Sequence, residues 1–340
     1  MKTVQNDPWA IDPKSYPADG TPGQQWEFLL QYAVLAPSSH NTQPWLFRMR
    51  HTVLDLYADR QRSCPAVDPD DRELIMSCGC ALFHLRCAMR HFGCLGTVEV
   101  FPEPHPDLLA RVHRGSIGET DPAQAMLFEA ILQRRTNRQL FSDDPLPPDL
   151  VPALQAAADS EGAWMKVVRE ETERLALAEL ISEGDRRQWA NARFRQELSH
   201  WVHPNHSARR DGIPGYAAGV DDLMSCMGPM VVRTFDLGEG QAARDSELAM
   251  GSPLLVVIGT VGDRPRDWVA GGQALAHVLL RATAAKVRAS FLNQPIELND
   301  LRMNLAELVG LEGYPQVVLR LGYADNVRPT PRREVEEVLM

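Results

Sequence analysis

An internal repeat restricts the fold of this chain more than any other feature of its sequence. The pattern Gly-x-Ala-Leu-x-His occurs at residues 79–84 and again at residues 272–277, and each copy begins a predicted helix of similar apolar character. Around each copy we predict the same order of elements: a helix, a strand, a long helix and two more strands. Close helix packing alone explains a short Gly-x-Ala-Leu match. The matching order of five elements, however, favours two tandem copies of one α+β unit.

The predicted strands occupy equivalent places in the two copies. A strand that begins with tryptophan precedes each long helix, and a short strand and a closing strand follow it. These strands are residues 45–49, 98–100 and 108–112 in the first copy and 164–168, 289–292 and 316–322 in the second. We therefore expect an α+β fold with a first half at residues 20–118 and a second half at residues 124–340. The two halves are expected to form an intramolecular pseudo-dimer with mixed sheets flanked by helices.

The two long helices are expected to pair about the pseudo-twofold axis. Gly79, Gly271 and Gly272 would then permit close approach of the two backbones. His84 and His277 are expected to be hydrogen-bonding residues of the core rather than catalytic groups. His84 also belongs to a stripe of cysteines and histidines on the first helix, but four ligands on one straight helix cannot surround an ion tetrahedrally. We therefore predict no metal site and interpret the stripe as a buried helix face.

The second copy is much longer than the first. Trp45 and Gly79 are 34 positions apart, whereas Trp164 and Gly272 are 108 positions apart, so the second copy carries about 74 extra residues by subtraction. We place this insertion at about residues 185–251, a segment rich in glycine and methionine. Two interpretations are open: a mobile lid over a pocket, or a subdomain with no functional role.

The composition excludes several classes of partner. The chain has 340 residues, of which 44% are hydrophobic, and this is enough for one large core or two linked cores. A net charge of −10 and a pI near 5.5 argue against a nucleic-acid partner or an anionic membrane surface. The longest apolar stretch, residues 253–258, is too short to span a bilayer. We therefore predict a cytoplasmic protein with neither nucleic-acid nor membrane partners.

Two polar elements distinguish the copies. The first copy contains the loop APSSHNTQPW at residues 36–45, whereas the second reads ADSEGA at the equivalent residues 158–163. The second copy contains the basic run RRTNR at residues 134–138, whereas the first has no arginine before Arg48. Each copy retains what the other lacks. One composite site at the pseudo-dimer interface, and so one ligand per chain, would produce this distribution.

Each element also has a purely structural explanation. Arg134, Arg135 and Arg138 end a predicted amphipathic helix at residues 126–138, where cations are favourable without any ligand. The sequence Pro-Ser-Ser at residues 37–39 is typical of a helix stop. The ordered combination of the two elements, with matching gaps in the other copy, favours a ligand site over these explanations.

These motifs resemble the FMN-dependent nitroreductase family, and the fused arrangement resembles its twin-domain, acg-like branch. The basic run matches an Arg-x-Ser-x-Lys/Arg element, with Thr136 in place of serine. The loop matches the family pattern Pro-Ser-Ser-x-Asn-x-Gln-Pro-Trp without a gap. Residues 320–324 and the basic tail at residues 331–333 resemble the closing strand and phosphate-contacting tail of the family. The resemblance covers most of residues 24–335.

The resemblance implies a binding site for FMN and assigns a role to each matching group. The arginines would neutralise the phosphate and lie near the pyrimidine edge of the flavin, and the serines and asparagine of the loop would bind the ribityl chain or the phosphate. No side chain is assigned a catalytic role, because the flavin carries the chemistry. The implied cofactor-binding residues are Pro37, Ser38, Ser39, Asn41, Gln43, Arg134, Arg135, Thr136, Arg138, Ser290, Leu292, Asn293, Arg332 and Arg333.

The resemblance also implies an activity. An oxidoreductase of this type transfers two electrons from NAD(P)H, a transient co-substrate, through flavin N5 to a small nitroaromatic or quinone-like acceptor. The alternative is a flavin-sequestering protein, in which the insertion around residues 216–230 covers the flavin and prevents turnover. A pseudo-dimer supplies both halves of the interface within one chain, so a homodimer is not required, although further association stays open.

Overall fold

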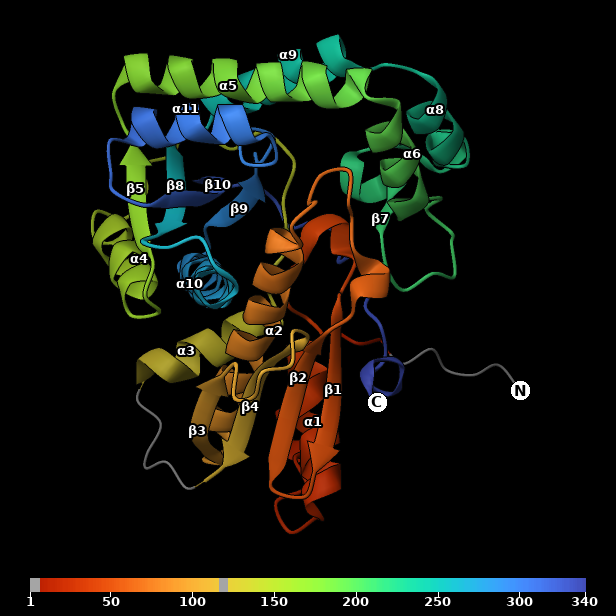
Figure 1. Cartoon of the computed structure of the whole chain (residues 1–340), viewed down its shortest axis with the longest axis vertical. Coiled ribbons are helices and arrows are strands. Elements are labelled where there is room, and N and C mark those ends of the chain that lie inside the picture. The colour runs from red at the N-terminus through yellow and green to blue at the C-terminus, as the bar shows by residue number, and fades with distance from the viewer. Residues whose placement is uncertain (1–6, 116–121) are drawn as a thin grey trace.

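The computed structural model of the chain describes residues 7–115 and 122–340. It contains two four-stranded sheets, and two long helices, α2 and α10, lie between them (Figure 1). The predicted end of the first half, at residue 118, lies outside the described residues.

The first half is a four-stranded sheet with two helices. Thr21 caps the first helix by accepting a hydrogen bond from the Gln24 backbone, and proline in the first turn supplies a preset φ. The strand order of the sheet is β1-β2-β4-β3, and every neighbouring pair is antiparallel. The elements are α1 (Pro22–Ala33), β1 (Trp45–Arg50), β2 (Val53–Ala58), α2 (Arg72–His91), β3 (Leu95–Val100) and β4 (Leu108–Arg114).

The second half repeats this arrangement. Its strand order is β5-β8-β10-β9, again with antiparallel neighbours, so equivalent strands occupy equivalent places in both sheets. The predicted α+β class is confirmed, while α11 between β9 and β10 has no equivalent in the described residues of the first half. The elements are α3 (Pro122–Ile131), α4 (Leu150–Asp159), β5 (Trp164–Val168), β8 (Leu254–Thr260), α10 (Pro265–Ala284), β9 (Arg288–Phe291), α11 (Asn299–Val309) and β10 (Tyr314–Gly322).

Neighbouring strands within both four-stranded sheets are antiparallel, and the predicted mixed character comes from parallel bridges at the sheet edges. Parallel pairing among the described residues occurs between β6 and β7 and at single bridges on the sheet edges. Thr136 bridges Ala289 beside β9, and Leu339 bridges Phe47 beside β1. The last bridge places the end of the second half on the sheet of the first. Short connections join β1 to β2 and β3 to β4, and such connections favour antiparallel neighbours. In the second half the equivalent connections are longer, with the insertion between β5 and β8 and α11 between β9 and β10.

The long helices α2 and α10 pack closely, as predicted. A Cβ atom on Gly79 would lie 2.5 Å from the Val269 carbonyl oxygen, and one on Gly272 would lie 2.0 Å from the Met76 carbonyl oxygen. Only glycine permits these distances, so the repeated glycine is explained by helix contact. His84 is fully buried with Nδ1 3.3 Å from the Tyr32 carbonyl oxygen, as expected for a core histidine.

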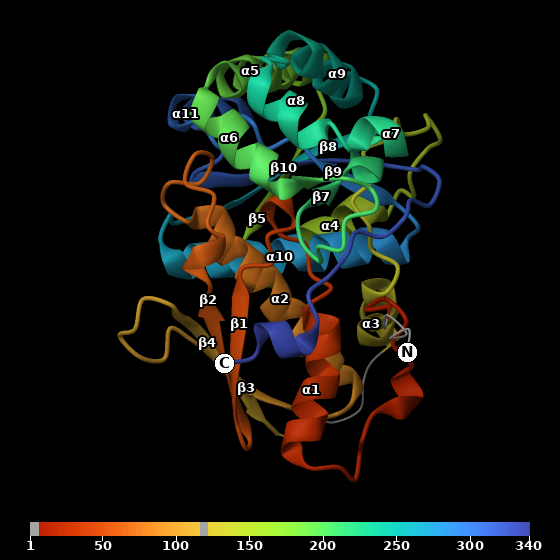
Figure 2. The same cartoon turned by 90° about the vertical axis from the view of Figure 1, so that its right-hand side faces the viewer.

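The insertion comprises residues 169–253, between β5 and β8, where the first half has a tight turn between β1 and β2. Figures 1 and 2 show its helices gathered at one end of the molecule. Helices α5 and α11 cover the outer face of the second sheet, and consequently β8 is buried along its whole length. Its elements are α5 (Glu171–Ala190), α6 (Ala192–Trp201), β6 (Val202–His203), β7 (Ile213–Pro214), α7 (Asp222–Ser225), α8 (Gly228–Thr234) and α9 (Gly238–Met250).

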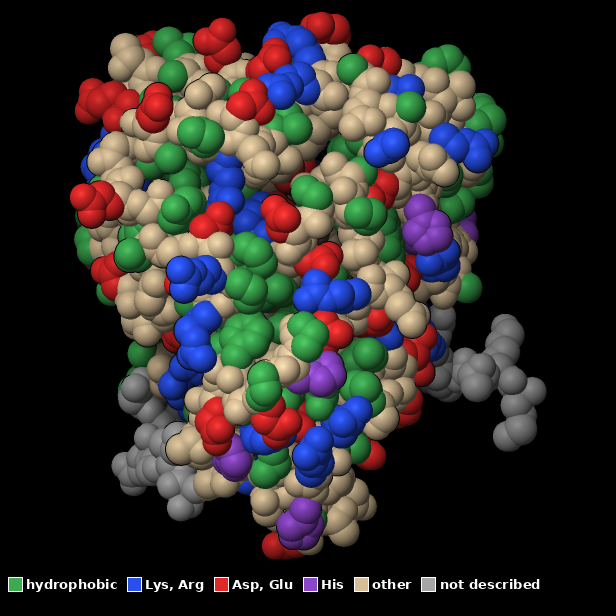
Figure 3. Space-filling view, in the orientation of Figure 1, with side chains coloured by type: hydrophobic (Ala, Val, Ile, Leu, Met, Phe, Trp, Pro, Cys, Tyr) green, Lys and Arg blue, Asp and Glu red, His purple; other side chains and the backbone are tan. Residues whose placement is uncertain are grey.

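None of the helices within the described ranges combines the length and apolar character that crossing a bilayer needs. Acidic and basic side chains are interspersed over the face shown in Figure 3.

Candidate functional site

The basic run at residues 134–138 lies beside β9 in extended conformation. Helix α3 ends at Ile131, so the predicted continuation of a helix to Arg138 is wrong. The open edge of β9 provides backbone partners that favour the extended form. Thr136 bridges Ala289, and the Asn137 backbone N–H donates to the Ala289 carbonyl oxygen at 3.0 Å. The arginines of this run are therefore placed by the sheet edge and not by a helix terminus.

Arg134 and Arg332 are buried cations without an acidic partner. Each side chain belongs to a residue that is only 3% exposed, and the Nε atom of each makes no hydrogen bond. Burial, followed by the neighbouring charge of Arg135, lowers the pKa of Arg134 to about 10. Burial, followed by the charges of Arg134 and Arg135, lowers the pKa of Arg332. Neither guanidinium forms an ion pair with a carboxylate in residues 7–115 or 122–340, and such isolated buried charge is costly.

Trp9 holds two of the arginines in place. Its ring centroid lies 3.6 Å from the Arg135 guanidinium carbon and 4.9 Å from that of Arg332. The indole N–H donates to the Thr330 carbonyl oxygen at 3.0 Å, which fixes the ring. Cation–π contacts of this kind stabilise a guanidinium without neutralising its charge. The arginines are thus positioned while their charge stays unpaired.

A cavity of about 110 Å³ adjoins these arginines. Its lining comes from residues 134–139, residues 216–219 of the insertion, residues 327–330 after β10, and Arg244 of α9. Arg138 Nη1 donates to the Ala217 carbonyl oxygen at 3.3 Å, and Tyr216 Oη donates to the Pro329 carbonyl oxygen at 2.9 Å. The insertion therefore forms one wall of the arginine-lined cavity.

The loop at residues 36–45 has an unusual backbone. Its 3₁₀ turn η2 (Ser39–Asn41) is followed by a return into β1. His40, Asn41 and Gln43 have φ angles of 47°, 55° and 53°, in the left-handed region that glycine normally occupies. Each such residue costs of order 1 kcal/mol or more and persists only where surrounding contacts impose it. Strain of this kind is concentrated at the element that the sequence predicts to be functional.

Asn41 and Gln43 supply the contacts that impose this backbone. Asn41 Oδ1 accepts from Arg332 Nη1 at 2.8 Å, and Asn41 Nδ2 donates to the Pro331 and Gly212 carbonyl oxygens at 3.1 and 3.0 Å. Gln43 Oε1 accepts from the Arg333 backbone N–H at 2.8 Å, and the Gln43 carbonyl accepts from Arg333 Nη1 at 3.0 Å. The loop of the first half is thereby joined to the basic tail of the second half.

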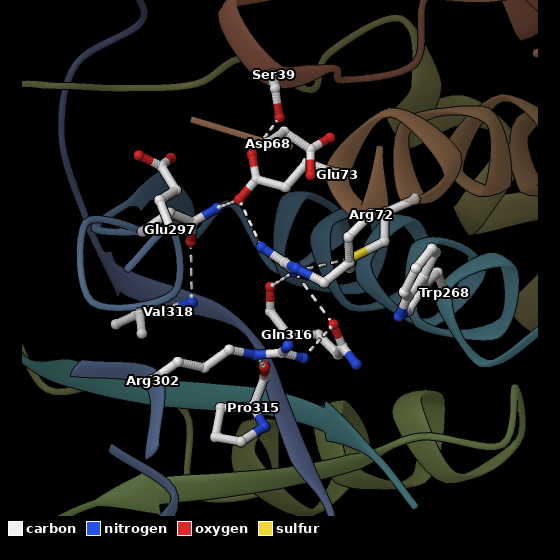
Figure 4. A network of polar contacts seen from close by, with 12 residues as sticks. Ser39, Asp68, Arg72, Glu73, Trp268, Glu297, Arg302, Pro315, Gln316 and Val318 are labelled. Atoms are coloured by element: carbon white, nitrogen blue, oxygen red, sulfur yellow. Dashed lines mark hydrogen bonds and ion pairs between the residues drawn. The ribbon is translucent and has the colours of Figure 1, made fainter. Parts of the chain in front are cut away.

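Glu73 makes a second connection between the halves (Figure 4). Ser39 Oγ donates to its carboxylate, Asn293 Nδ2 donates to its Oε1 at 3.3 Å, and Arg72 Nη2 donates to the same oxygen at 3.0 Å. Burial, followed by the charge of Glu73, raises the pKa of Asp68 to about 6. The first-half loop and Asn293 therefore meet at one buried carboxylate.

The remaining predicted residues are buried or make hydrogen bonds and strand pairs within the protein. Pro37 is buried, and Ser38 Oγ accepts from the Gln43 backbone N–H at 2.9 Å. Ser290 is paired with Arg320 within the sheet, and the Leu292 backbone N–H donates to the Val318 carbonyl oxygen at 3.0 Å. The structure thus groups the loop, the basic run and the basic tail, and it connects Asn293 to them through Glu73.

Proteins similar to this chain include several that are named as nitroreductases. No protein-family model matches the chain. The solved structure of the FMN-dependent nitroreductase NfnB from Mycobacterium smegmatis in complex with NADPH aligns at 18% identity and a TM-score of 0.40, covering 63% of this chain and 96% of that one. "Putative NAD(P)H nitroreductase acg" of Mycobacterium tuberculosis is 29% identical over 320 residues, covering 91% of this chain and 93% of the relative.

A second relative decides the family. "Putative NAD(P)H nitroreductase Rv3131" of Mycobacterium tuberculosis is 33% identical over 321 residues, which cover 92% of this chain and 90% of the relative. The chain belongs to the NAD(P)H nitroreductase family. The family resemblance inferred from the loop and the basic run is thereby confirmed.

Sequence reasoning missed several groups around the site of this nitroreductase family member. Trp9, Glu73 and Arg244 belong to no recognised motif, although all three contact or line the region of the predicted residues. Glu73 lies in the first turn of α2, where an acidic residue is ordinary on helix-dipole grounds. No local signal separates it from other acidic residues. Tyr216, by contrast, was included in the predicted lid segment and does line the cavity.

Proposed function

We propose that this chain is an FMN-dependent NAD(P)H oxidoreductase of the nitroreductase type. The observation that carries the proposal is the pair of buried arginines, Arg134 and Arg332, which have no carboxylate partner in the described parts of the chain. The charge of Arg135 lowers the pKa of both arginines, and the charge of Arg134 also lowers that of Arg332. An anion bound between Arg134 and Arg332 would therefore relieve both desolvation and like-charge repulsion. A terminal phosphate is an anion of this kind.

The residues present fit such a cofactor. Arg134 and Arg332 would bind the phosphate, with Arg135 held beside them by Trp9. Arg333 is less free for this role, because its guanidinium bonds the Gln43 and Glu337 carbonyl oxygens and lies 4.0 Å from the Asp59 carboxylate. Arg138 lines the other part of the same cavity, as a group near the flavin ring would.

Asn41 and Gln43 act as positioning residues in this proposal. Their side chains are occupied by the basic tail and by residues 210–212 of the insertion, so they orient Arg332 rather than bind the ligand with free groups. Bound FMN would supply two-electron transfer between a nicotinamide and a small acceptor. The chain itself would bind the phosphate, orient the arginines and exclude water through the wall formed by residues 216–219.

A visible spectrum followed by anaerobic mixing with NADPH or NADH tests the proposal. We expect purified protein to be yellow and to contain one FMN per chain. Reduction should remove the visible absorbance of the flavin. Subsequent addition of a nitroaromatic or quinone should restore the absorbance. A colourless protein that is not reconstituted by added FMN would contradict the proposal.

Flavin sequestration is a second candidate, and the wall of the cavity favours it. Residues 216–219 contact Arg138 and Pro329 across the cavity, so this segment of the insertion closes over the arginine cluster. A closed wall would block a nicotinamide. Yellow protein that stays oxidised with both nucleotides, yet is reduced by dithionite, would favour sequestration over turnover.

A further inference from the structure

Two arginines at the cavity belong to neither the basic run nor the basic tail. Arg244 lies on α9 of the insertion, and Arg328 lies in the segment after β10. Figure 2 shows that segment beside β7 and α7, in agreement with the hydrogen bond from Tyr216 to the Pro329 carbonyl oxygen. The cavity is therefore lined by five arginines and by no acidic residue. This is more positive charge than one phosphate dianion requires.

Arg244 and Arg328 differ from Arg134 in their exposure. Both are exposed, whereas Arg134 is buried. The Arg328 guanidinium carbon lies 4.2 Å from the Tyr216 ring centroid, so that side chain is held against the wall of the cavity. Neither arginine forms an ion pair with a carboxylate over the described ranges of the chain. The adjacent Asp245 carboxylate instead accepts hydrogen bonds from Gln241 and Gln294.

Buried and exposed cations suit different ligands. A buried unpaired guanidinium is stabilised by an anion that stays bound, because the cost of its isolation returns whenever the anion leaves. An exposed guanidinium remains hydrated without a ligand, so an anion can arrive and depart at little cost. Exposed charges also accelerate the encounter with a ligand of opposite charge. The two classes of arginine therefore match a resident group and a visiting group.

We propose that Arg244 and Arg328 form a subsite for an anionic substituent, a phosphate or a carboxylate, of the visiting substrate. The proposal rests on the proposed function, since it assumes that the buried arginines hold the cofactor. Two sources carry this chemistry: the 2′-phosphate that distinguishes NADPH from NADH, or an acidic group on the electron acceptor. The Tyr216 ring, which packs against Arg328, forms the apolar side of the same subsite.

The test is equilibrium binding to FMN-saturated protein, measured by calorimetry. The probes are two matched pairs: 2′-phospho-ADP-ribose against ADP-ribose, and 4-nitrobenzoate against nitrobenzene. The variants are Arg244→Gln, Arg328→Gln and the double substitution. Arg233→Gln is the matched control, because Arg233 is an exposed arginine of α8 outside the cavity.

We expect the double variant to lose at least about tenfold in affinity for the member of one pair that carries the extra anionic group, with its matched probe unchanged, as loss of charged hydrogen bonds implies. Weaker binding of 2′-phospho-ADP-ribose alone would identify NADPH, the electron donor, as the source of the anionic group, and weaker binding of 4-nitrobenzoate alone would identify the electron acceptor. Equal loss for both members of a pair, or no loss, would overturn the subsite. Weaker FMN binding in Arg244→Gln or Arg328→Gln would overturn it too, because these arginines would then belong to the cofactor. A wild-type protein that binds these anions but not FMN would contradict the proposed function alone.

Discussion

The segment that leads into the first strand of each four-stranded sheet is built in two different ways. In the first half, residues 34–44 connect α1 to β1 through a long loop in which His40, Asn41 and Gln43 have positive φ angles. In the second half, residues 160–163 connect α4 to β5 through a short turn, and Gly162 supplies the positive φ of 80°. The second turn uses the residue best suited to its backbone. The first uses residues whose conformation is imposed by contacts with distant segments.

The charges near these two segments also differ. Beside the short turn, Arg86 of α2 in the first half donates through Nη1 to the Glu161 carboxylate at 2.5 Å and to Gln273 Oε1 at 2.6 Å. This arginine therefore has its counter-ion within the protein, across the boundary between the halves. Arg134 of the basic run and Arg332, which bonds Asn41 of the long loop, have none in the described ranges. One contact between the halves thus pairs its cation with a carboxylate, whereas the cations of the candidate site have no carboxylate partner.

The largest expected effect concerns cofactor affinity. Arg134→Gln should weaken FMN binding by about 30-fold or more, because removing one partner of a buried charged contact costs about 2–5 kcal/mol. Arg86→Gln should leave the FMN dissociation constant unchanged, since Arg86 already has its acidic partner. Fluorescence titration of FMN into apoprotein measures both constants. Equal losses in the two variants would show that general destabilisation, not the missing counter-ion, explains the result.

The next effect concerns stability without cofactor and has opposite signs for Arg134 and Arg86. Arg134→Met should raise the free energy of unfolding by about 1–2 kcal/mol, because it replaces an unpaired buried charge with apolar volume. Arg86→Met should lower it by about 1–3 kcal/mol, because the mostly buried Glu161 carboxylate loses its partner. Urea unfolding of the two apoproteins measures the difference. A destabilised Arg134→Met protein would mean that Arg134 has a stabilising role unrelated to a ligand.

A smaller effect is expected from the turn of the second half. Gly162→Ala should lower the free energy of unfolding by about 1 kcal/mol, because alanine is disfavoured at positive φ although no atom lies within 4 Å of the added Cβ. Gly240→Ala is the control: it also meets open space, but on α9, where alanine should stabilise by about 0.5 kcal/mol. Thermal unfolding compares the two. Equal shifts would show that the φ angle of Gly162 is not what requires glycine.

The smallest expected effect is a pH dependence of stability that should be equal in the two halves. Burial lowers the pKa of His84 to about 3 and that of His277 to about 4. Below pH 6.5 the unfolded chain therefore binds protons that the folded chain does not, so stability falls as the pH falls. Each histidine should contribute about 0.7 kcal/mol to the loss between pH 7 and pH 6. In urea unfolding at several pH values, His84→Gln and His277→Gln should each reduce the loss of free energy of unfolding by the contribution of one histidine. Unequal reductions in the two variants would show that the two helices are not equivalent.

Much of the fold could be predicted because it depends on local patterns. The glycines of the repeat mark the contact of α2 with α10, and the tryptophans mark the first strand of each sheet. The direction of strand pairing is not a local property, because the parallel bridges at the sheet edges join residues that are far apart in the chain. Helix α11 was also missed, although Leu301, Leu305 and Val309 recur at helical spacing on its buried face.

The site could be predicted only in outline. Of the 35 basic residues, only Lys2, Lys14, Lys166 and Lys286 are lysine, leaving 31 arginines, so an arginine by itself indicates little. Burial distinguishes Arg134 and Arg332 from the others, and burial depends on segments that meet only in the folded chain. Trp9 illustrates this, because its indole bonds Thr330, 321 positions away. Such long-range contacts leave no pattern in a local stretch of sequence.

The bridge between Leu339 and Phe47 has a consequence for the order of folding. Met340 donates its backbone N–H to the Phe47 carbonyl oxygen at 2.9 Å, so the edge of β1 is covered by a segment that is synthesised long after it. Segments near the N-terminus emerge and begin to fold first. The nascent first half therefore has the edge of β1 uncovered and Asn41 without Arg332. The composite site can assemble only once Arg332 has been synthesised, so its ligand is captured late in the folding of each chain.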